Sequence, residues 1–408
     1  MTQHEDVDAF RARARAWLAA TMPRLADAPD LPDEDAEWAR ARELQRLLHD
    51  GGFAGISYPA EYGGLGLTPA HQQAFTEESA AYEMPLLLNV PTLGICGPTI
   101  LEYGSEELKQ QHLPRILRGE EILVQFLSEP RGGSDLGGLI TRAERVEGGW
   151  SLNGAKTWST CAYSADWALC LARTDWDVPK HEGLTMFLVP TDAPGITMRR
   201  IRMVNDTEEF CEEFLDDVFV PDAQVLGEPG QGWQVVMRQL FHEKGAVGGG
   251  SPYVSGAGRS RITRPKTDPV ALARSAGRLD DPATRELLGR WHASETVHRQ
   301  LNARIRTGLG SGLLPAPAAS MMMLFHARAD AFNDDVALEI AGAGVVAASG
   351  PAGQLIRKAS TNYLMRQASS LGGGSAEMSR NIISERLLSM PREPAPDRGV
   401  PFREVARG

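Results

Sequence analysis

The sequence predicts a multi-domain α+β protein with an N-terminal helical domain, a central small β-barrel and a C-terminal helical bundle. The chain has 408 residues, which is more than one hydrophobic core usually holds. Short alternating runs separated by turns fill the middle of the chain, and helical periodicity lies on both sides of them. We therefore place domains at residues 1–120, 121–228 and 229–391, followed by a tail at 392–408.

Helix signals run through the first 120 residues. Helices are expected at 6–26, 36–50, 69–83 and 86–102, and one more is capped by Ser105. The apolar segment 86–102 contains prolines and glycines, so we expect a broken helix there. Two interpretations of it stay open: part of the domain core, or part of the wall of a ligand cavity.

The central region reads as seven strands, at 122–128, 140–146, 150–158, 167–173, 184–190, 196–203 and 210–220. Gly148-Gly149 and Asn153-Gly154 are turn signals between them. This spacing is typical of a small closed barrel or a sandwich. Because helical domains flank it, ligand clefts are expected at its edges.

Helical periodicity returns at 233–244. Further helices are expected at 268–279, 282–309, 316–347, 351–368 and 375–389. The segment 245–258 is rich in glycine and serine, so it is expected to be mobile. The polar, proline-rich tail from residue 392 is expected to be poorly ordered.

Composition excludes several classes of protein. A net charge of −11 argues against nucleic acid as a partner. The four cysteines and nine histidines show no metal-ligand spacing, so no metal site is expected. The N-terminus lacks an apolar signal segment, and the longest apolar stretch, 84–101, is too broken for a membrane span. A reduced, cytoplasmic protein fits these observations.

The chemically informative segment runs from Gln125 to Asp135 and reads as a strand entering a glycine-rich turn. Glycines there let the backbone approach an anion or a ring acceptor closely. A second strand ends in Lys156-Thr157-Trp158-Ser159-Thr160, which places a flat aromatic face beside two hydroxyl groups. From the residues alone, two ordinary turns with a core tryptophan are an equally good interpretation.

The order and spacing of these segments resemble the flavin-binding signature of the acyl-CoA dehydrogenase family: a Thr/Ser-Glu-Pro-x-x-Gly-Ser-Asp turn followed by Trp-x-Thr/Ser. The resemblance continues at 179–190, 214–221 and 380–386 and covers nearly the whole chain. It implies the fold given above and flavin adenine dinucleotide (FAD) as cofactor. It also implies a cavity-lining role for 86–102 toward the acyl chain. The cofactor contacts that it implies are Gln125, Leu127, Ser128, Gly133, Ser134, Trp158, Ser159, Thr160, Glu339, Gly342, Ser375 and Glu377.

The family's reaction removes an α-proton from an acyl thioester while a hydride leaves the β-carbon for the flavin, so a carboxylate base is needed. Two positions supply this base in different branches of the family. One corresponds to Gly373, which cannot act as a base, although its N–H could point at the thioester carbonyl. The other corresponds to Glu243, within Leu240-Phe241-His242-Glu243-Lys244. The resemblance therefore implies Glu243 as the base; without it, a solvated acid at a helix end is the simpler interpretation.

The resemblance also implies partners. In the family the stretch matching 339–343 reaches a neighbouring subunit's cofactor, which predicts a homodimer or homotetramer joined through the C-terminal domains. The expected substrate is a thioester of CoA or of acyl carrier protein, and the expected electron acceptor is an electron-transfer flavoprotein. Departures from the family pattern are Lys244, Glu339, Arg131 and the lack of an Arg-x-x-Phe-Gly motif in 255–275.

Two other functions stay open. One is a flavin-dependent oxidase or monooxygenase on the same fold, which would use oxygen directly. The other is a non-catalytic subunit that completes a hetero-oligomeric acyl-CoA dehydrogenase.

Overall fold

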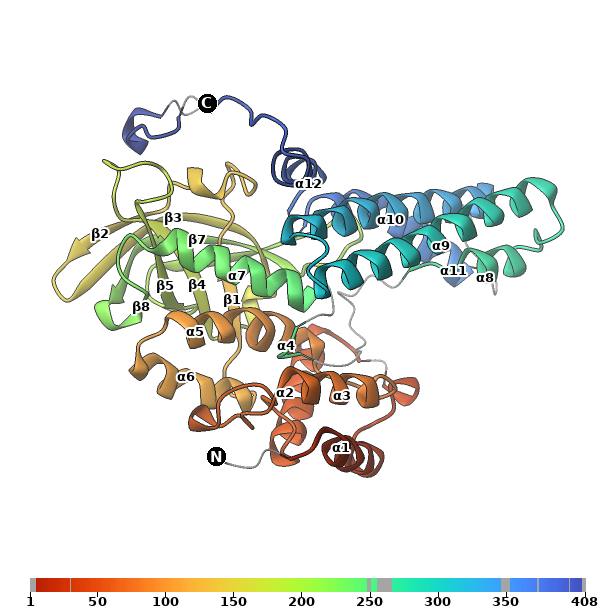
Figure 1. Cartoon of the computed structure of the whole chain (residues 1–408), viewed down its shortest axis with the longest axis horizontal. Helices are drawn as coiled ribbons and strands as arrows, with labels where there is room; N and C mark the ends of the chain where they lie inside the picture. Colours follow the sequence, from red (N-terminus) through yellow and green to blue (C-terminus); the bar gives the residue numbers. More distant parts are fainter. Residues whose placement is uncertain are drawn as a thin grey trace. The chain divides into compact units, whose positions relative to one another are not determined.

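The computed structural model describes residues 5–29, 31–247, 251–254, 266–345, 353–372, 374–395 and 397–405 (Figure 1). The chain divides into two compact units. Unit 1 comprises residues 1–202, 208–262 and 396–408, and unit 2 comprises residues 203–207 and 263–395. Of the glycine-rich segment expected at 245–258, residues 248–250 and 255–258 lie outside the described residues.

The N-terminal part of unit 1 is helical, as predicted. Its regular helices are α1 (Val7–Thr21), α2 (Glu34–Asp50), α3 (Pro69–Ser79) and α6 (Glu106–Leu117). The Asp6 and Asp33 carboxylates cap α1 and α2 by accepting hydrogen bonds from first-turn N–H groups. Phe10, Leu44 and Phe75 are buried in the core that joins α1, α2 and α3.

The segment expected as a broken helix is broken. It consists of α4 (Leu86–Pro91), a π-helical turn η3 (Thr92–Cys96) and α5 (Gly97–Tyr103). The π-helical turn is tied to the first strand, because the Thr92 hydroxyl accepts a hydrogen bond from the Leu123 N–H at 3.0 Å. It also packs closely on helix α7 (Gly232–Val247): a Cβ on Gly94 would lie 2.8 Å from the Ala246 side chain.

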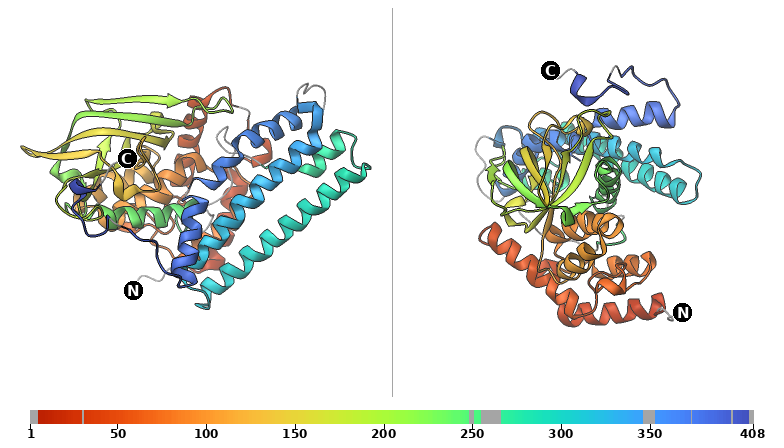
Figure 2. Two further views of the ribbon diagram at one scale, coloured as in Figure 1. Left: turned by 90° about the horizontal axis from the view of Figure 1, so that it is seen from above. Right: turned by 90° about the vertical axis from the view of Figure 1, so that its left-hand side faces the viewer.

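The central region forms one sheet that contains all seven predicted strands and one more. The strands are β1 (Leu123–Phe126), β2 (Arg142–Val146), β3 (Gly149–Thr160), β4 (Trp167–Arg173), β5 (Leu184–Pro190), β6 (Ile196–Ile201), β7 (Phe210–Pro221) and β8 (Val225–Leu226). Their order is β6-β7-β3-β2-β4-β5-β8, with β1 on β4. The central β domain is thereby confirmed, as a strongly twisted sheet (Figure 2). Within residues 121–228, all of which are described, no ladder joins β6 to β8. The expected ring of hydrogen bonds is therefore open, because the two-residue β8 pairs with β5 and β6 pairs with β7.

Strand β4 lies between two hydrophobic cores, which explains why every residue after its first is buried. Ala168 and Cys170 pack into the inner core of the sheet with Phe187. Leu169 and Leu171 pack on the opposite face, in a core shared with α5, α6 and α7. Figure 1 shows these three helices beside the sheet. The four cysteines are buried and free.

Unit 2 is a bundle of helices, as predicted. It contains α8 (Pro269–Ser275), α9 (Pro282–Gly310), α10 (Ala319–Ala341), α11 (Gly353–Met365) and α12 (Ala376–Ile382). Leu272, Val336 and Ile356 are buried in its core. None of the helices in the described part of the chain is long and apolar enough to cross a membrane.

The prediction of a poorly ordered tail is wrong for residues 397–405. These residues return to unit 1 and contain a short 3₁₀ turn, η11 (Phe402–Glu404). The physical reason is one large apolar residue in an otherwise polar stretch. Phe402 is buried against Arg173 and Trp176, which lie at and just after the end of β4.

Candidate functional site

The two predicted cofactor segments meet at the ends of β1 and β3. The Thr157 N–H donates to the Ser128 carbonyl at 2.9 Å, which joins the glycine-rich turn to the second strand. The Glu129 carboxylate accepts hydrogen bonds from the Ile140 and Thr141 N–H groups at 2.7 and 2.8 Å and pairs with the Lys156 ammonium at 3.2 Å. Burial opposes ionisation of Glu129, but Lys156 and these N–H groups outweigh it and hold its pKa below the ordinary value. The turn therefore has a fixed, buried ionic anchor.

Trp158 lies on the surface, so its interpretation as a core tryptophan is wrong. Its φ angle is 65°, which is unusual for a bulky residue, and it stands where the register of β3 against β7 shifts. The side chain is 53% exposed and meets the Phe210 ring edge to face at 5.7 Å. A bulky residue in a left-handed conformation costs free energy, and such residues gather at functional sites. The bulge turns a flat aromatic face outward beside the turn.

The other predicted contacts in these segments divide into accessible and buried groups. Gly133, Ser134 and Thr160 are exposed, and Ser128 is partly exposed. Leu127 is buried, and its carbonyl accepts a hydrogen bond from the Lys156 ammonium at 3.1 Å. The Ser159 hydroxyl points into the β domain and donates to the Glu213 carboxyl at 3.1 Å. The side chains of Leu127 and Ser159 are thus engaged inside the protein.

The predicted base lies near the same strand end. Helix α7 starts against β5, where a Cβ on Gly232 would come within 2.6 Å of the Leu184 backbone. This close approach fixes the position of the helix along its axis. Eleven residues on, by the numbering from Gly232 to Glu243, the Glu243 carboxylate accepts a hydrogen bond from the Gln125 side-chain amide at 3.1 Å. Burial raises the pKa of Glu243, and the Gln125 hydrogen bond and Lys244 oppose that rise. A partly buried carboxyl with a raised pKa is suited to accept a proton. Its hydrogen-bond partner, Gln125, lies three residues before Ser128 in the sequence.

A second polar cluster fixes the rotation of α7 about its own axis. The sequence did not point to this cluster. The Arg238 guanidinium makes a two-point hydrogen bond with the Glu102 carboxylate, at 2.7 and 2.6 Å, and the His242 imidazole lies 3.0 Å from the same carboxylate. The Arg238 hydrogen bond lowers the pKa of Glu102, and burial lowers the pKa of His242. Arg238 and His242 are four residues apart on one helix, so their side chains lie on the same face. This spacing is the sequence feature from which a shared partner could have been predicted.

The remaining predicted residues belong to unit 2. Glu339 and Gly342 lie at the C-terminal end of α10, where Arg278 donates to the Glu339 and Ile340 carbonyls at 3.3 and 2.7 Å. Gly342 has φ 54°, a conformation that favours glycine. Ser375 caps α12, and Glu377 in its first turn pairs with Arg380 at 3.0 Å. Gly373 lies outside the described residues.

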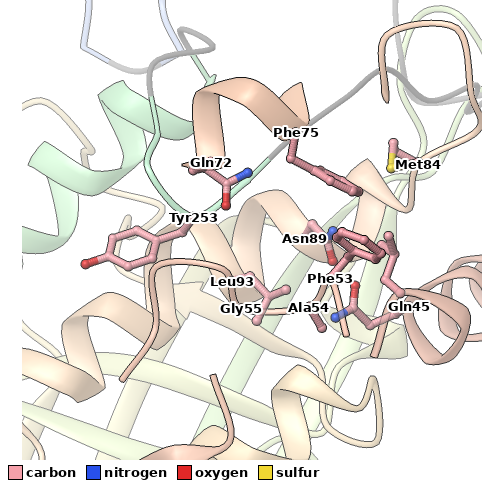
Figure 3. Close-up of a pocket in the computed structure, with 11 residues that line it drawn as sticks. Gln45, Phe53, Ala54, Gly55, Gln72, Phe75, Met84, Asn89, Leu93 and Tyr253 are labelled. Carbon is pink, nitrogen blue, oxygen red and sulfur yellow. The ribbon is translucent and has the colours of Figure 1, made fainter. Parts of the chain in front are cut away.

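A small cavity in unit 1 bears on the two interpretations of 86–102. Figure 3 shows Gln45, Phe75, Asn89 and Leu93 around it, with Tyr253 at one side. Its volume is ≈ 20 Å³. The Gln45 and Asn89 side-chain oxygens are buried and accept no hydrogen bond from the described residues. A space of this size with polar groups suits about one water molecule, so this cavity is too small for an acyl chain. The role of 86–102 toward an acyl chain stays a prediction.

Three family models match consecutive parts of the chain. The acyl-CoA dehydrogenase N-terminal domain matches residues 4–120, the middle domain residues 125–218 and the C-terminal domain residues 230–388. The chain belongs to the acyl-CoA dehydrogenase family. The predictions of family, three-part fold and enzyme class are therefore confirmed. Membership makes this acyl-CoA dehydrogenase one of the flavoprotein oxidoreductases, and a flavin is the cofactor type that it implies.

Individual relatives agree with this assignment. The acyl-CoA dehydrogenase IpdE1 of Mycobacterium tuberculosis is 34% identical over 395 residues, covering 95% of this chain and 99% of the relative. The solved structure described as Tcur3481-Tcur3483 steroid ACAD is 27% identical with a TM-score of 0.73, covering 96% of this acyl-CoA dehydrogenase and 100% of that chain. A chain of the ChsE4-ChsE5 complex from Mycobacterium tuberculosis shares the fold, with 24% identity, a TM-score of 0.68 and coverage of 96% and 100%.

Proposed function

We propose that this acyl-CoA dehydrogenase binds FAD and catalyses α,β-dehydrogenation of an acyl-CoA to the trans-2-enoyl-CoA, with Glu243 as the base. The observation that carries the proposal is the hydrogen bond between Gln125 and Glu243. It brings the predicted base to the strand that enters the cofactor turn. The base for the substrate's α-carbon and the contacts to the flavin would then lie at the same end of β1.

The residues present fit a flavin. Trp158 offers an exposed aromatic face, and aromatic faces stack on planar ring systems. The neighbouring turn is exposed at Gly132, where a Cβ would meet nothing within 4 Å. Backbone N–H groups in such turns accommodate anions, which suits the dinucleotide part of FAD. Ser128, Ser134 and Thr160 add hydroxyl donors at the same place.

The FAD, when bound, supplies the hydride acceptor. The protein's part is to remove a weakly acidic α-proton and to exclude water. The raised pKa of Glu243 makes its carboxylate a stronger base than an ordinary glutamate. The hydrogen bond from Gln125 holds one of the carboxylate oxygens in place. The Glu102–Arg238–His242 cluster fixes the rotation of α7, so the carboxyl of Glu243 keeps its direction. The Gly373 N–H is proposed as a donor to the thioester oxygen.

The proposal includes the acceptor and the class of thioester. An electron-transfer flavoprotein takes the electrons, and CoA or acyl carrier protein carries the acyl group. The steroid relative, at 27% identity, makes a steroid-derived acyl-CoA a substrate to test beside straight-chain and branched ones.

The experiment is anaerobic mixing of purified, FAD-loaded protein with a panel of acyl thioesters, followed by flavin absorbance. Bleaching by an acyl-CoA, with reoxidation by an electron-transfer flavoprotein and slow turnover in air, is the expected result. Fast turnover with peroxide formation would support the oxidase or monooxygenase instead. A folded protein that takes up no FAD alone, but does so with a second chain, would support the partner-subunit alternative, which the two-chain description of the steroid relative also favours.

A further inference from the structure

The C-terminal segment 397–405 contacts the part of the β domain that supports the cofactor turn. Its anchor is Phe402, which is only 2% exposed. The Arg173 guanidinium lies 3.5 Å from the centre of the Phe402 ring, and the Trp176 ring lies 5.4 Å from it. Backbone hydrogen bonds add to this contact: the Phe402 and Arg403 N–H groups donate to the Val178 and Trp176 carbonyls, both at 2.9 Å. The segment is therefore docked by its main chain as well as by one side chain.

Arg173 connects this anchor to the residues just after the turn. It is completely buried, and its guanidinium donates to the Gly137 carbonyl at 2.6 Å and to the Leu139 carbonyl at 3.2 Å. It also donates to the Lys180 carbonyl at 3.2 Å. The Phe402 ring therefore covers the Arg173 guanidinium, which donates hydrogen bonds to these three carbonyls. A cation over an aromatic face gains most when water is excluded from the pair.

Lys180 makes a second connection. Its ammonium lies 2.7 Å from the Asp397 carboxylate in the C-terminal segment and 3.1 Å from the Asp135 carboxylate in the turn. Lys180 is mostly buried, with 19% of its side chain exposed. One ammonium thus joins the last residue of the turn motif to the first described residue of the docked segment.

We propose that residues 397–405 act as a strap that positions the glycine-rich turn 128–138 for FAD, with Phe402 and Asp397 as its positioning residues. This inference rests on the proposed FAD binding. The strap keeps the Arg173 guanidinium on the Gly137 and Leu139 carbonyls. It also keeps the Lys180 ammonium on the Asp135 carboxylate. Docking of the strap and binding of FAD favour the same conformation of the turn, so each stabilises the other.

The main experiment measures FAD affinity of the full-length apoprotein by quenching of flavin fluorescence. Phe402→Ala is expected to weaken FAD binding about 5-fold or more, within the usual range for coupled sites. Glu404→Ala is the matched control, because Glu404 is exposed in the same short turn, and it should bind FAD like the parent. Asp397→Asn removes only the ion pair with Lys180 and should weaken binding in the same direction. It replaces Phe402→Ala if circular dichroism shows that the larger change unfolds the protein.

The second experiment measures amide hydrogen exchange, to test whether FAD binding stabilises the docked strap and whether the strap stabilises the turn. FAD is expected to slow exchange of the Phe402 and Arg403 amides, and Phe402→Ala to speed exchange of the Gly138 and Leu139 amides even without FAD. Unchanged FAD affinity in both strap variants, together with unchanged exchange at these amides, would overturn the strap. A parent protein that binds no FAD would instead overturn the proposed function, and exchange in the apoprotein would still decide whether the strap orders the turn.

Discussion

Glu213 of β7 holds a carboxyl group in the interior of the β domain, where β7 pairs with β3. The residue is completely buried, and one of its oxygens accepts a hydrogen bond from Ser159 at 3.1 Å. The other oxygen has no hydrogen-bond partner among the described residues. Burial raises the pKa of Glu213 to about 8. The carboxyl is therefore protonated at neutral pH in the folded protein.

This burial predicts how stability depends on pH. The unfolded chain would titrate Glu213 near the ordinary value of 4.5, whereas the folded chain holds the proton up to about pH 8. Between these values the folded state binds more protons, so this residue's contribution to stability falls as pH rises through that window, by up to about 1.4 kcal/mol per pH unit. Above pH 8 the contribution becomes constant.

Glu213→Gln keeps the shape and the acceptor for Ser159 but removes the titration. Thermal unfolding between pH 5 and 8 should show a smaller loss of stability in Glu213→Gln than in the parent. Glu213→Leu, which removes the polar group altogether, should show the same flattening. Identical pH profiles for the parent and both variants would mean that Glu213 is not the titrating group.

Removing the Trp158 side chain is expected to change cofactor binding without changing the fold. Because the side chain is 53% exposed, Trp158→Ala should leave unfolding within about 0.5 kcal/mol of the parent. Loss of stacking on a flat face should weaken FAD binding, by about 1–3 kcal/mol if it resembles other aromatic–base stacking. Fluorescence titration measures this directly, and Phe219→Ala, another exposed aromatic of the β domain, is the control. Equal FAD affinity in parent and Trp158→Ala would place the flavin elsewhere.

At the residue scale, the local structure of contiguous segments could be predicted from the sequence, whereas their roles toward a cofactor stay predictions. The turn and the Trp158 strand end were identified because their residues are contiguous. Glu102 and Tyr253 were missed because they reach α7 from elsewhere in the chain, and only the fold brings them to His242. The inward direction of the Ser159 side chain depends on the bulge at Trp158, which shifts the alternation of inside and outside along β3.

At the scale of elements, helix α7 carries the proposed base, Glu243, and the position of the helix along its axis depends on Gly232. A Cβ on Gly232 would lie 2.6 Å from backbone atoms of Leu184 and Thr185, which cannot move as a side chain tip can. Gly232→Ala should therefore destabilise the protein by about 1–3 kcal/mol. It should also shift α7 and with it the hydrogen bond from Gln125 to Glu243.

Chemical denaturation measures the stability change, and flavin reduction by an acyl-CoA reports the shift of α7. Gly289→Ala is the matched control, since Gly289 also lies in a helix but its Cβ would meet nothing within 4 Å. That control should be neutral or up to about 1 kcal/mol more stable. Equal stability in Gly232→Ala and Gly289→Ala would show that α7 has room to adjust.

Element boundaries were predicted where they depend on local chemistry. The break in 86–102 follows from Pro91 and the glycines around it. The existence of β8 and the docking of Phe402 could not be predicted, because a two-residue strand and a single apolar residue carry no periodicity. Both are stabilised by distant partners: β8 by Met186 and Phe187, and Phe402 by Arg173.

At the scale of the whole molecule, unit 2 is inserted into unit 1. In the sequence, residues 263–395 of unit 2 lie between two parts of unit 1, and the short segment 203–207 also belongs to unit 2. Unit 2 also exposes large apolar side chains, with Leu364 52%, Leu371 65% and Leu388 63% exposed. Exposed apolar side chains mark a protein interface where they gather in one patch, and these three are the candidates for such a patch in unit 2.

We therefore expect a homodimer or homotetramer joined through the helices of unit 2. Sedimentation velocity of the FAD-loaded protein should show a species at least twice the mass of one chain, and Leu371→Lys should shift it toward the monomer. A stable monomer that retains FAD would contradict this assembly. A chain that assembles only after a second protein is added would indicate a hetero-oligomer.

The rate of flavin reduction in Glu243→Gln tests most directly whether Glu243 is the base. This substitution keeps the size of the side chain and a partner for Gln125, but it removes the base. Stopped-flow absorbance under anaerobic conditions, with an acyl-CoA that bleaches the parent, should show FAD binding and ligand binding retained and the reduction rate lowered about 10²–10⁴-fold. Reduction of Glu243→Gln at the parental rate would contradict the assignment of Glu243 as the base.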